Sequence, residues 1–273
     1  SFTLLGHTIQ YPVWEGAVSH LFYAQRLYQL PLGVFGVSLA TAIFPQMSID
    51  AAKRDFDSLR RSASLGLRGT IFVAVPATVG LLLIGRPVVA VILQRGRFLP
   101  ADTAQTAVTL SFYVLGLTGF FAQQVLTRAF YALQESSVPA RTAIIAVAAS
   151  LVLNLVLIWP LGSGGLAAAT SICSYMQVTM LILALRRRLG PGVLAGMARA
   201  LRDTAIATLT MAAAVAGVEY LTGGATGIVG LALAVVAGTA AYLLVARLLH
   251  VEMLSLFLGK GRRAGNPSGD RNL

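Results

Sequence analysis

A single positive charge stands at the head of a long apolar segment. Arg26 is followed by no charged residue until Asp50, and most residues between them are Leu, Val, Ala, Phe or Gly. Inside a bilayer an arginine costs about 2.5–3.5 kcal/mol on insertion scales, so it normally has a partner or a function. Its planar guanidinium binds two phosphate oxygens at once. Arg26 is therefore either an anchor at the membrane interface or a ligand for an anionic group inside a cavity.

The residues around the arginine favour the cavity. Gln25 and Gln29 add polar groups, and Gln29 is expected to share a helical face with Gly33 and Gly36. Pro31 interrupts the backbone hydrogen bonds of the same helix, which is tolerated beside a cavity or at a bend. The anchor stays open as an alternative. An arginine roughly 13 Å along a helix can still reach the interface by snorkelling.

A second set of polar side chains lies in the uncharged run 142–185. Asn154 and Thr170 stand at similar distances on either side of a glycine-rich turn, so we expect them at equal depth in two antiparallel helices. A hydrogen bond between the helices is the simpler interpretation, typically contributing less than ~2 kcal/mol. A cation site with oxygen ligands is the other, although such a site normally includes a carboxylate.

The sequence offers no set of residues for soluble-enzyme chemistry. His7, His20 and His250 are far apart and lack the spacing of metal ligands, which predicts ordinary packed or interfacial histidines. The glycine-rich stretch 162–165 lacks the following Lys-Ser/Thr of a phosphate-binding loop, so it is predicted to be a turn. Cys173 is the one cysteine of the chain and cannot form an internal disulfide.

Composition predicts an all-α integral membrane protein, a polytopic helical bundle. Of 273 residues, 56% are hydrophobic and 11% charged, whereas soluble domains carry roughly 25% charged residues. The net charge of +11 could suggest nucleic acid, but the basic residues stand between apolar runs, so no nucleic-acid partner is expected. The chain begins without Met inside an apolar stretch, which predicts the later part of a longer protein.

Seven complete membrane spans and the end of an eighth are expected. Residues 1–14 are predicted to end a helix, and the helix from 17 to 44 to stop at Pro45. An interfacial helix at 50–68 leads into a span at 66–84, which is ended by 85–87 and followed by a short apolar piece at 88–94. Further spans are expected within 103–127, in the two halves of 142–185, and at about 200–221 and 226–248.

Basic residues assign the sides of the membrane. Following the alternation of spans, 17 basic residues fall on one side and 3 on the other, with Arg26 within a span. Because cytoplasmic loops carry the excess of Lys and Arg, the first side, with the C-terminus, is predicted to be cytoplasmic.

Several motifs in order resemble the MurJ/MviN family of lipid II flippases. They are GAVS at 16–19, YAQRLYQLPLGVFG at 23–36, QRGRF at 94–98, RAFYA at 128–132, LNL at 153–155 and GGLA at 164–167. The resemblance implies a fourteen-helix exporter of the multidrug/oligosaccharidyl-lipid/polysaccharide superfamily, with two six-helix lobes and two extra helices. In this chain, 1–188 would be the second lobe from the end of helix seven to helix twelve, 189–258 the two extra helices, and 259–273 a basic cytoplasmic tail.

The resemblance also implies a function. Such proteins carry lipid II, an undecaprenyl-diphosphate-linked muropeptide, from the inner to the outer leaflet of the bacterial cytoplasmic membrane by alternating access. They are transporters, not enzymes. No cofactor is expected beyond coupling to a monovalent cation or the membrane potential, and the partners are lipid II, membrane lipids and the missing first lobe. An exporter of another lipid-linked polysaccharide, or a non-transporting scaffold of the cell-wall machinery, stays open as an alternative.

The resemblance assigns roles to particular residues. Arg26 matches the family's diphosphate-binding arginine, with Gln25 in place of the usual Asp and Gln29 one turn away. Thr170 matches a sodium ligand of some members, while Ser150 and Asn154 stand where Asn and Asp would be expected. The last two helices would hold the undecaprenyl tail in a groove, which small residues permit: Gly217, Gly230, Ala234 and Gly238.

Overall fold

The described chain is almost entirely helical. The computed structural model describes residues 2–4, 7–9, 16–222, 227–249 and 251. Its helices are α1 (Ala17–Pro31), the π-helical segment η1 (Leu32–Gly36), α2 (Val37–Ala52), α3 (Phe56–Leu93), α4 (Pro100–Leu115), α5 (Leu117–Ala132), α6 (Ser137–Leu161), α7 (Ser163–Leu189), the 3-10 turn η2 (Pro191–Leu194), α8 (Met197–Leu221) and α9 (Ile228–Leu248). Within these residues six helical segments are long and apolar enough to cross a membrane, and a bent pair makes up to seven. The predicted helical membrane fold is confirmed.

The helix expected at 1–14 is wrong for the described residues of that stretch. Strand β1 (Phe2–Leu4) pairs with the antiparallel strand β2 (His7–Ile9), with Thr3 opposite Thr8. Aromatic and β-branched side chains favour extended backbone. The stretch 1–14 also contains Ser1, Thr3, His7, Thr8 and Gln10 among its apolar residues, so hydropathy was a weak guide here.

Proline does not end the helices where the sequence predicted ends. The helix expected to stop at Pro45 continues to the end of α2, and Pro76 and Pro87 lie inside α3. The segments predicted separately at 50–68, 66–84 and 88–94 are therefore mostly one helix, α3. In hydrocarbon every freed backbone group lacks water, so a helix that bends around a proline is favoured over one that ends there.

The uncharged run expected as one span at 103–127 is broken. Helices α4 and α5 meet at Gly116 with a bend of 40°. Hydroxyl groups of α7 bond carbonyl groups around the bend: Ser171 Oγ donates to the Phe112 carbonyl oxygen at 2.6 Å, and the Tyr175 hydroxyl donates to that of Leu115 at 2.6 Å. The break is thus held by a neighbouring helix, which sequence pattern cannot reveal.

The later elements agree with the sequence. The turn predicted in the glycine-rich stretch 162–165 is confirmed at its first residue, because α6 and α7 meet at Gly162, whose φ of +55° favours glycine. The spans expected at about 200–221 and 226–248 correspond to α8 and α9. The tail 259–273 lies outside the described residues.

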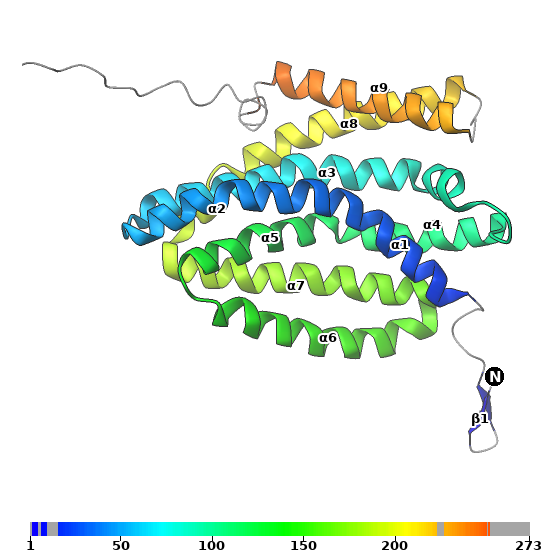
Figure 1. Ribbon diagram of the computed structural model, residues 1–273, viewed down its shortest axis with the longest axis horizontal. Coiled ribbons are helices and arrows are strands. Elements are labelled where there is room, and N and C mark those ends of the chain that lie inside the picture. The colour runs from blue at the N-terminus through cyan, green and yellow to red at the C-terminus, as the bar shows by residue number, and fades with distance from the viewer. Residues whose placement is uncertain (1, 5–6, 10–15, 223–226, 250, 252–273) are drawn as a thin grey trace, which may run out of the picture.

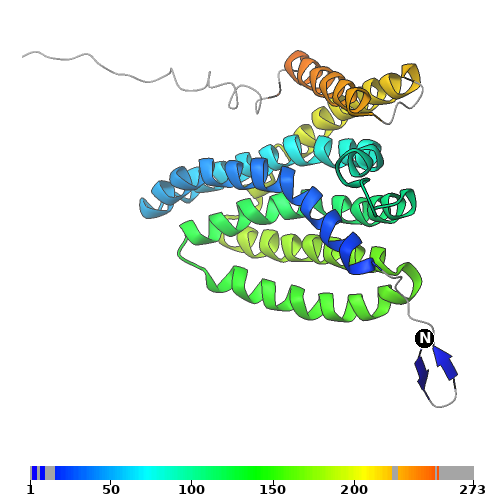
Figure 2. The same ribbon diagram turned by 45° about the vertical axis from the view of Figure 1, so that its right-hand side comes forward.

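Helix α3 packs both against the helices that precede α8 and against the pair α8 and α9, which are the two parts of the bundle. One group of buried side chains lies between α2, α3, α5 and α7, and a second between α1, α3, α4, α5 and α7. A third group connects α3 to α8 and α9. Both views place α8 and α9 beyond α3, on the side away from α6 (Figures 1 and 2). Displacement of α3 would therefore disturb both parts.

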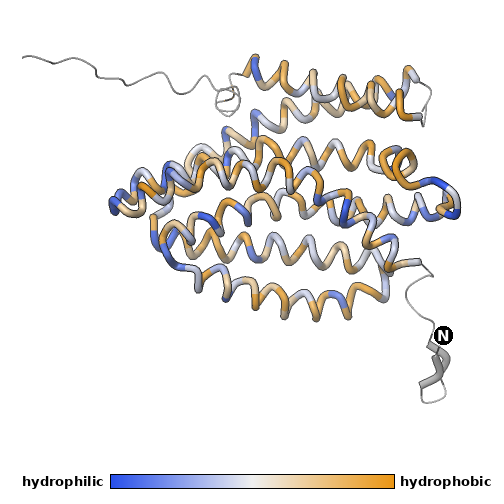
Figure 3. The backbone as a smooth tube through the Cα atoms, viewed as in Figure 1, coloured by the Kyte–Doolittle hydropathy of each residue, from blue (hydrophilic) through white to orange (hydrophobic). Residues whose placement is uncertain are grey.

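Polar residues gather at the two ends of the bundle. Figure 3 shows hydrophilic residues at the α2–α3 turn and near the ends of α5, α7 and α9 on one side, and at the α3–α4 turn on the other. Between them the helices are mostly apolar, as the spans require. The arrangement agrees with alternating spans, while the side that faces the cytoplasm stays a prediction.

The close contact at the bend generates a stability prediction. A Cβ atom on Gly116 would lie 2.8 Å from the Ser171 Cα, which is too close for α7 to stay in place. We expect Gly116→Ala to lower the free energy of unfolding by about 1–3 kcal/mol, the usual cost of overpacking. Thermal unfolding of the purified full-length protein would measure it. Gly217→Ala is the matched control, because nothing lies within 4 Å of its added Cβ. Equal unfolding temperatures for the two variants would contradict the prediction.

Candidate functional site

Arg26 lies on the face of α1 that the chain leaves open. The opposite face, with Ala24, Leu27 and Tyr28, is buried among α3, α4 and α5. Arg26 itself is exposed, and its Cζ lies 5.0 Å from the centroid of the Phe22 ring. Within the part of the chain that the structure describes, the ion pairs include none with Arg26. An arginine without a carboxylate partner, deep in an apolar helix, is suited to bind an anion.

The polar neighbours are only partly arranged as predicted. Gln25 is exposed beside the arginine, and Gln29 is half-buried. Gly33 is open, with nothing within 4 Å of an added Cβ, but Gly36 is buried against Phe121 of α5. The shared face predicted for Gln29, Gly33 and Gly36 is therefore wrong. The π-helical segment η1 changes the rotational phase of the helix between the glycines, and α-helical spacing no longer applies there.

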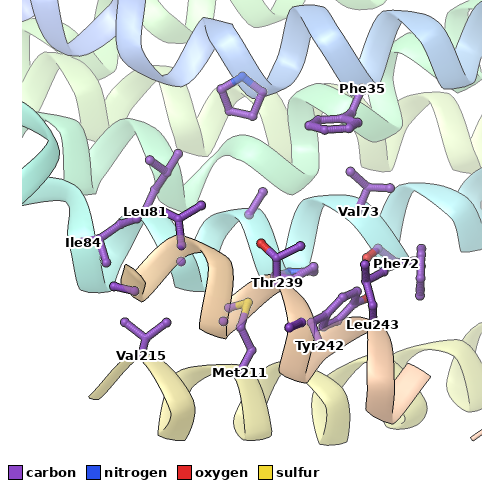
Figure 4. Close-up of a pocket in the computed structure, with 18 of the residues that line it drawn as sticks. Phe35, Phe72, Val73, Leu81, Ile84, Met211, Val215, Thr239, Tyr242 and Leu243 are labelled. Carbon is purple, nitrogen blue, oxygen red and sulfur yellow. The ribbon is translucent and has the colours of Figure 1, made fainter. Parts of the chain in front are cut away.

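An apolar groove of about 850 Å³ lies between α3, α8 and α9 (Figure 4). Phe35 of η1 also lines it, together with Phe72 and Tyr242, which come from α3 and α9. Of the small residues expected to permit a groove, Ala234 and Gly238 line it. The lining includes a single charged residue, Arg247. A groove of this lining suits a long apolar chain.

The other two small residues do not line the groove. Gly217 and Gly230 are absent from its lining, and an added Cβ on Gly217 would meet no atom within 4 Å. The Tyr242 hydroxyl donates to the Phe72 carbonyl oxygen at 2.5 Å, which fixes α9 against α3 at the groove. The presence of small residues in the sequence therefore predicted more lining positions for the groove than the structure has.

The polar pair on α6 is isolated from the polar residue of α7. Asn154 Nδ2 donates to Ser150 Oγ at 3.3 Å, both within α6, and the Asn154 Oδ1 is buried without a hydrogen-bond partner among the described residues. The Thr170 hydroxyl donates instead to the Leu166 carbonyl oxygen of its own helix. The expected Asn154–Thr170 hydrogen bond is not formed. The unpaired amide oxygen fits a cation ligand, but one amide and two hydroxyls lack the carboxylate that a tight site normally includes.

One contact between polar side chains was missed by the sequence analysis. His20 is buried at the start of α1, and its Nε2 lies 3.2 Å from Asp102 Oδ1 in the first turn of α4. These residues are 82 positions apart, so spacing gives no signal for the pair. Among the described residues no group of three or more His, Cys, Asp or Glu side chains could hold a metal ion. His250 lies outside the described residues.

Comparison with known proteins identifies similar sequences and structures. A family model described as lipid II flippase MurJ matches residues 3–247. The probable lipid II flippase MurJ of Vibrio cholerae is 35% identical over 166 residues, 61% of this chain and 32% of that protein. The probable lipid II flippase MurJ of Rickettsia prowazekii is 34% identical over 167 residues, 61% of this chain and 33% of that protein. A solved structure of lipid II flippase MurJ, in an inward closed conformation, matches with a TM-score of 0.73 and 25% identity, covering 91% of this chain and 48% of that chain.

The matches differ in how much they cover. The chain spans about a third of the length of the curated relatives it matches and about half of the solved structure. The helical bundle described above is therefore similar to one part of a larger transporter.

The unpaired amide oxygen of Asn154 generates a prediction on cation binding. Without a carboxylate, the oxygens of Asn154, Ser150 and Thr170 are expected to bind Na⁺ weakly. We therefore expect the unfolding temperature of the full-length protein to be the same in sodium chloride and in potassium chloride at equal ionic strength. Asn154→Leu removes a buried unsatisfied oxygen, which normally costs about 1–3 kcal/mol, and is expected not to lower stability. Stabilisation by sodium that disappears in Asn154→Leu would establish the cation site and overturn this expectation.

Proposed function

The chain belongs to the lipid II flippase MurJ family, a family of transporters and not of enzymes, and from this premise we propose that the full protein moves lipid II across the bacterial cytoplasmic membrane. In this proposal the lipid-linked precursor passes from the inner to the outer leaflet by alternating access. The chain contributes the second lobe (1–188) and two further helices (189–258), and a first lobe closes the cavity. The C-terminus lies in the cytoplasm, because the side with more basic residues is placed there.

The observation that carries the proposal is the exposed guanidinium of Arg26. It stands on the open face of α1, its contact with Phe22 leaves its N–H donors free for an anion, and no described carboxylate neutralises it. A diphosphate offers the paired oxygens that a guanidinium binds through two parallel hydrogen bonds. Gln25 and Gln29 can donate amide hydrogen bonds to the same head group.

The apolar groove supports the same substrate. A polyprenyl tail needs a long apolar surface, and the groove between α3, α8 and α9 provides it. Phe35, nine residues after Arg26 on the same helix, lines that groove, which places it roughly 13 Å along the axis from the charge. One helix thus presents a phosphate ligand and, about two turns later, a wall of the tail site.

The energy source of transport is part of the proposal. A monovalent cation or the membrane potential would drive the cycle, and no organic cofactor is included. A change of the membrane potential by 100 mV contributes about 2.3 kcal/mol for each elementary charge that moves. For an anionic substrate that leaves the cytoplasm, an inside-negative potential acts in the required direction.

The guanidinium is tested by two substitutions in the full-length protein, in cells depleted of their own flippase. Arg26→Ala is expected to abolish growth and to accumulate lipid II, because the diphosphate loses its ligand. Arg26→Lys is expected to rescue poorly, since an ammonium group cannot form the paired hydrogen bonds. Membrane abundance and lipid II content are the measurements.

Arg86→Ala is the matched control for that experiment. Arg86 is exposed like Arg26 but lies near the C-terminal end of α3, so its loss is expected to leave growth unchanged. Normal growth of Arg26→Ala at normal abundance would make Arg26 an interface anchor and refute its role in binding.

The tail site is tested by filling the groove. Val235→Trp adds bulk to a residue that lines it, whereas Val236→Trp changes the next residue, which is 66% exposed and is not part of the lining. We expect Val235→Trp to slow lipid II translocation and Val236→Trp to leave it unchanged, at equal membrane abundance. The same rate for both variants would exclude the groove as the tail site.

A further inference from the structure

The guanidinium of Arg26 is held by an aromatic ring. The Cζ of Arg26 lies 5.0 Å from the Phe22 centroid, one helical turn earlier on the open face of α1. A cation over a ring face is attracted by the negative side of the ring quadrupole, and this attraction is stronger where water is excluded. The contact uses the charge and none of the N–H donors, so Arg26 remains able to form hydrogen bonds with an anion.

Phe22 is itself positioned by other aromatic rings. Its ring meets that of Tyr23 edge-to-face, with centroids 5.8 Å apart and planes at 72°. Tyr23 meets Phe98, in the turn before α4, at 5.9 Å and 84°. Such edge-to-face pairs are favoured by the ring quadrupoles and restrict the rotation of each ring.

The series of rings ends at the hydrogen bond between His20 of α1 and Asp102 of α4. Phe98 meets His20 at 6.4 Å and 82°, and His20 Nε2 is 3.2 Å from Asp102 Oδ1. Asp102 is in turn fixed by the Leu99 backbone N–H, which donates to Asp102 Oδ2 at 2.8 Å. A continuous set of contacts therefore runs from the N-terminus of α4 to the guanidinium.

Phe22 has little reason to be aromatic for the sake of packing alone. Its side chain is 52% exposed, so it does not belong to the described core. An exposed position in a membrane helix accepts Leu, Ile or Val as well as Phe, because all partition into hydrocarbon. What an aliphatic residue cannot supply is the π face under the arginine.

We propose that Phe22 is a positioning residue for substrate binding: its ring holds the Arg26 guanidinium in place so that the N–H donors meet the diphosphate without first having to be ordered. The inference rests on the proposed function, because it requires that Arg26 binds the substrate. Ordering a long side chain costs conformational entropy. If the Arg26 side chain is already ordered before the substrate arrives, this cost is not part of the binding free energy, and the diphosphate binds more tightly. Phe22 acts through Arg26 and does not itself bind the phosphates.

The test measures the affinity of the purified full-length protein for undecaprenyl diphosphate. Phe22→Leu is expected to weaken binding about two- to fivefold, the size of an exposed cation–π contact, whereas Phe22→Tyr keeps the ring and the affinity. Undecaprenol, which lacks the phosphates, is expected to bind all three proteins equally and shows that the variants are folded. Phe56→Leu, at a phenylalanine of α3 that is 50% exposed, is the matched control and is expected to have no effect.

A double mutant separates this inference from the proposed function. In an Arg26→Ala protein, Phe22→Leu is expected to cause no further loss, because the ring has no guanidinium to hold. If Arg26→Ala abolishes diphosphate binding while Phe22→Leu binds like the parent, the positioning role is wrong and the proposed function stands. If Arg26→Ala binds normally, the proposed role of Arg26 fails, and the positioning role with it. Equal losses for Phe22→Leu and Phe56→Leu would indicate a general packing effect and overturn the inference.

Discussion

Backbone hydrogen bonding in hydrocarbon is the constraint on which this structure depends. A polar backbone group that faces lipid has no water to bond, so helices continue through prolines that would end them in a soluble protein. Helix α3 contains two such prolines, Pro76 and Pro87. Where the chain does break, at Gly116, hydroxyl groups of α7 bond carbonyl oxygens around the break. Irregular backbone is therefore found where a neighbouring helix can satisfy it.

Close approach of the helices is the second consequence. Hydrocarbon provides no hydrophobic driving force between helices, so packing and hydrogen bonds have to hold them, and small residues make this possible. Gly116 faces Ser171 at a distance that excludes any side chain, and Gly238 of α9 faces Val215 of α8 in the same way. The connector to α8 is held on α3 by the Ser64 hydroxyl, which donates to the Ala195 carbonyl oxygen at 2.8 Å. Through these contacts α8 and α9 are fixed beside α3, and the groove between them is formed.

The two faces of α1 have different tasks. The buried face sets the position of the helix, with Tyr28 stacked on Tyr113 at 4.9 Å. The exposed face carries Arg26, and the π-helical segment that follows turns Phe35 toward the groove. A π-helical turn is rare and is often found at functional sites. Here it places an apolar wall about two turns after a charged group on one helix, which is the arrangement that an amphiphilic lipid requires.

The sequence by itself determined the membrane class, most of the spans and the unusual position of Arg26 in an apolar helix, because hydropathy and charge are properties of each local segment. The same local signals misjudged residues 1–14 and the ends at prolines, since propensity does not include the cost of unpaired backbone in lipid. Tertiary structure alone decided the break at Gly116, the His20–Asp102 pair and the separation of Asn154 from Thr170. Each of these three features depends on contacts between residues far apart in the chain or on the rotation of one helix against another. Residue spacing encodes neither the distant contacts nor the rotation.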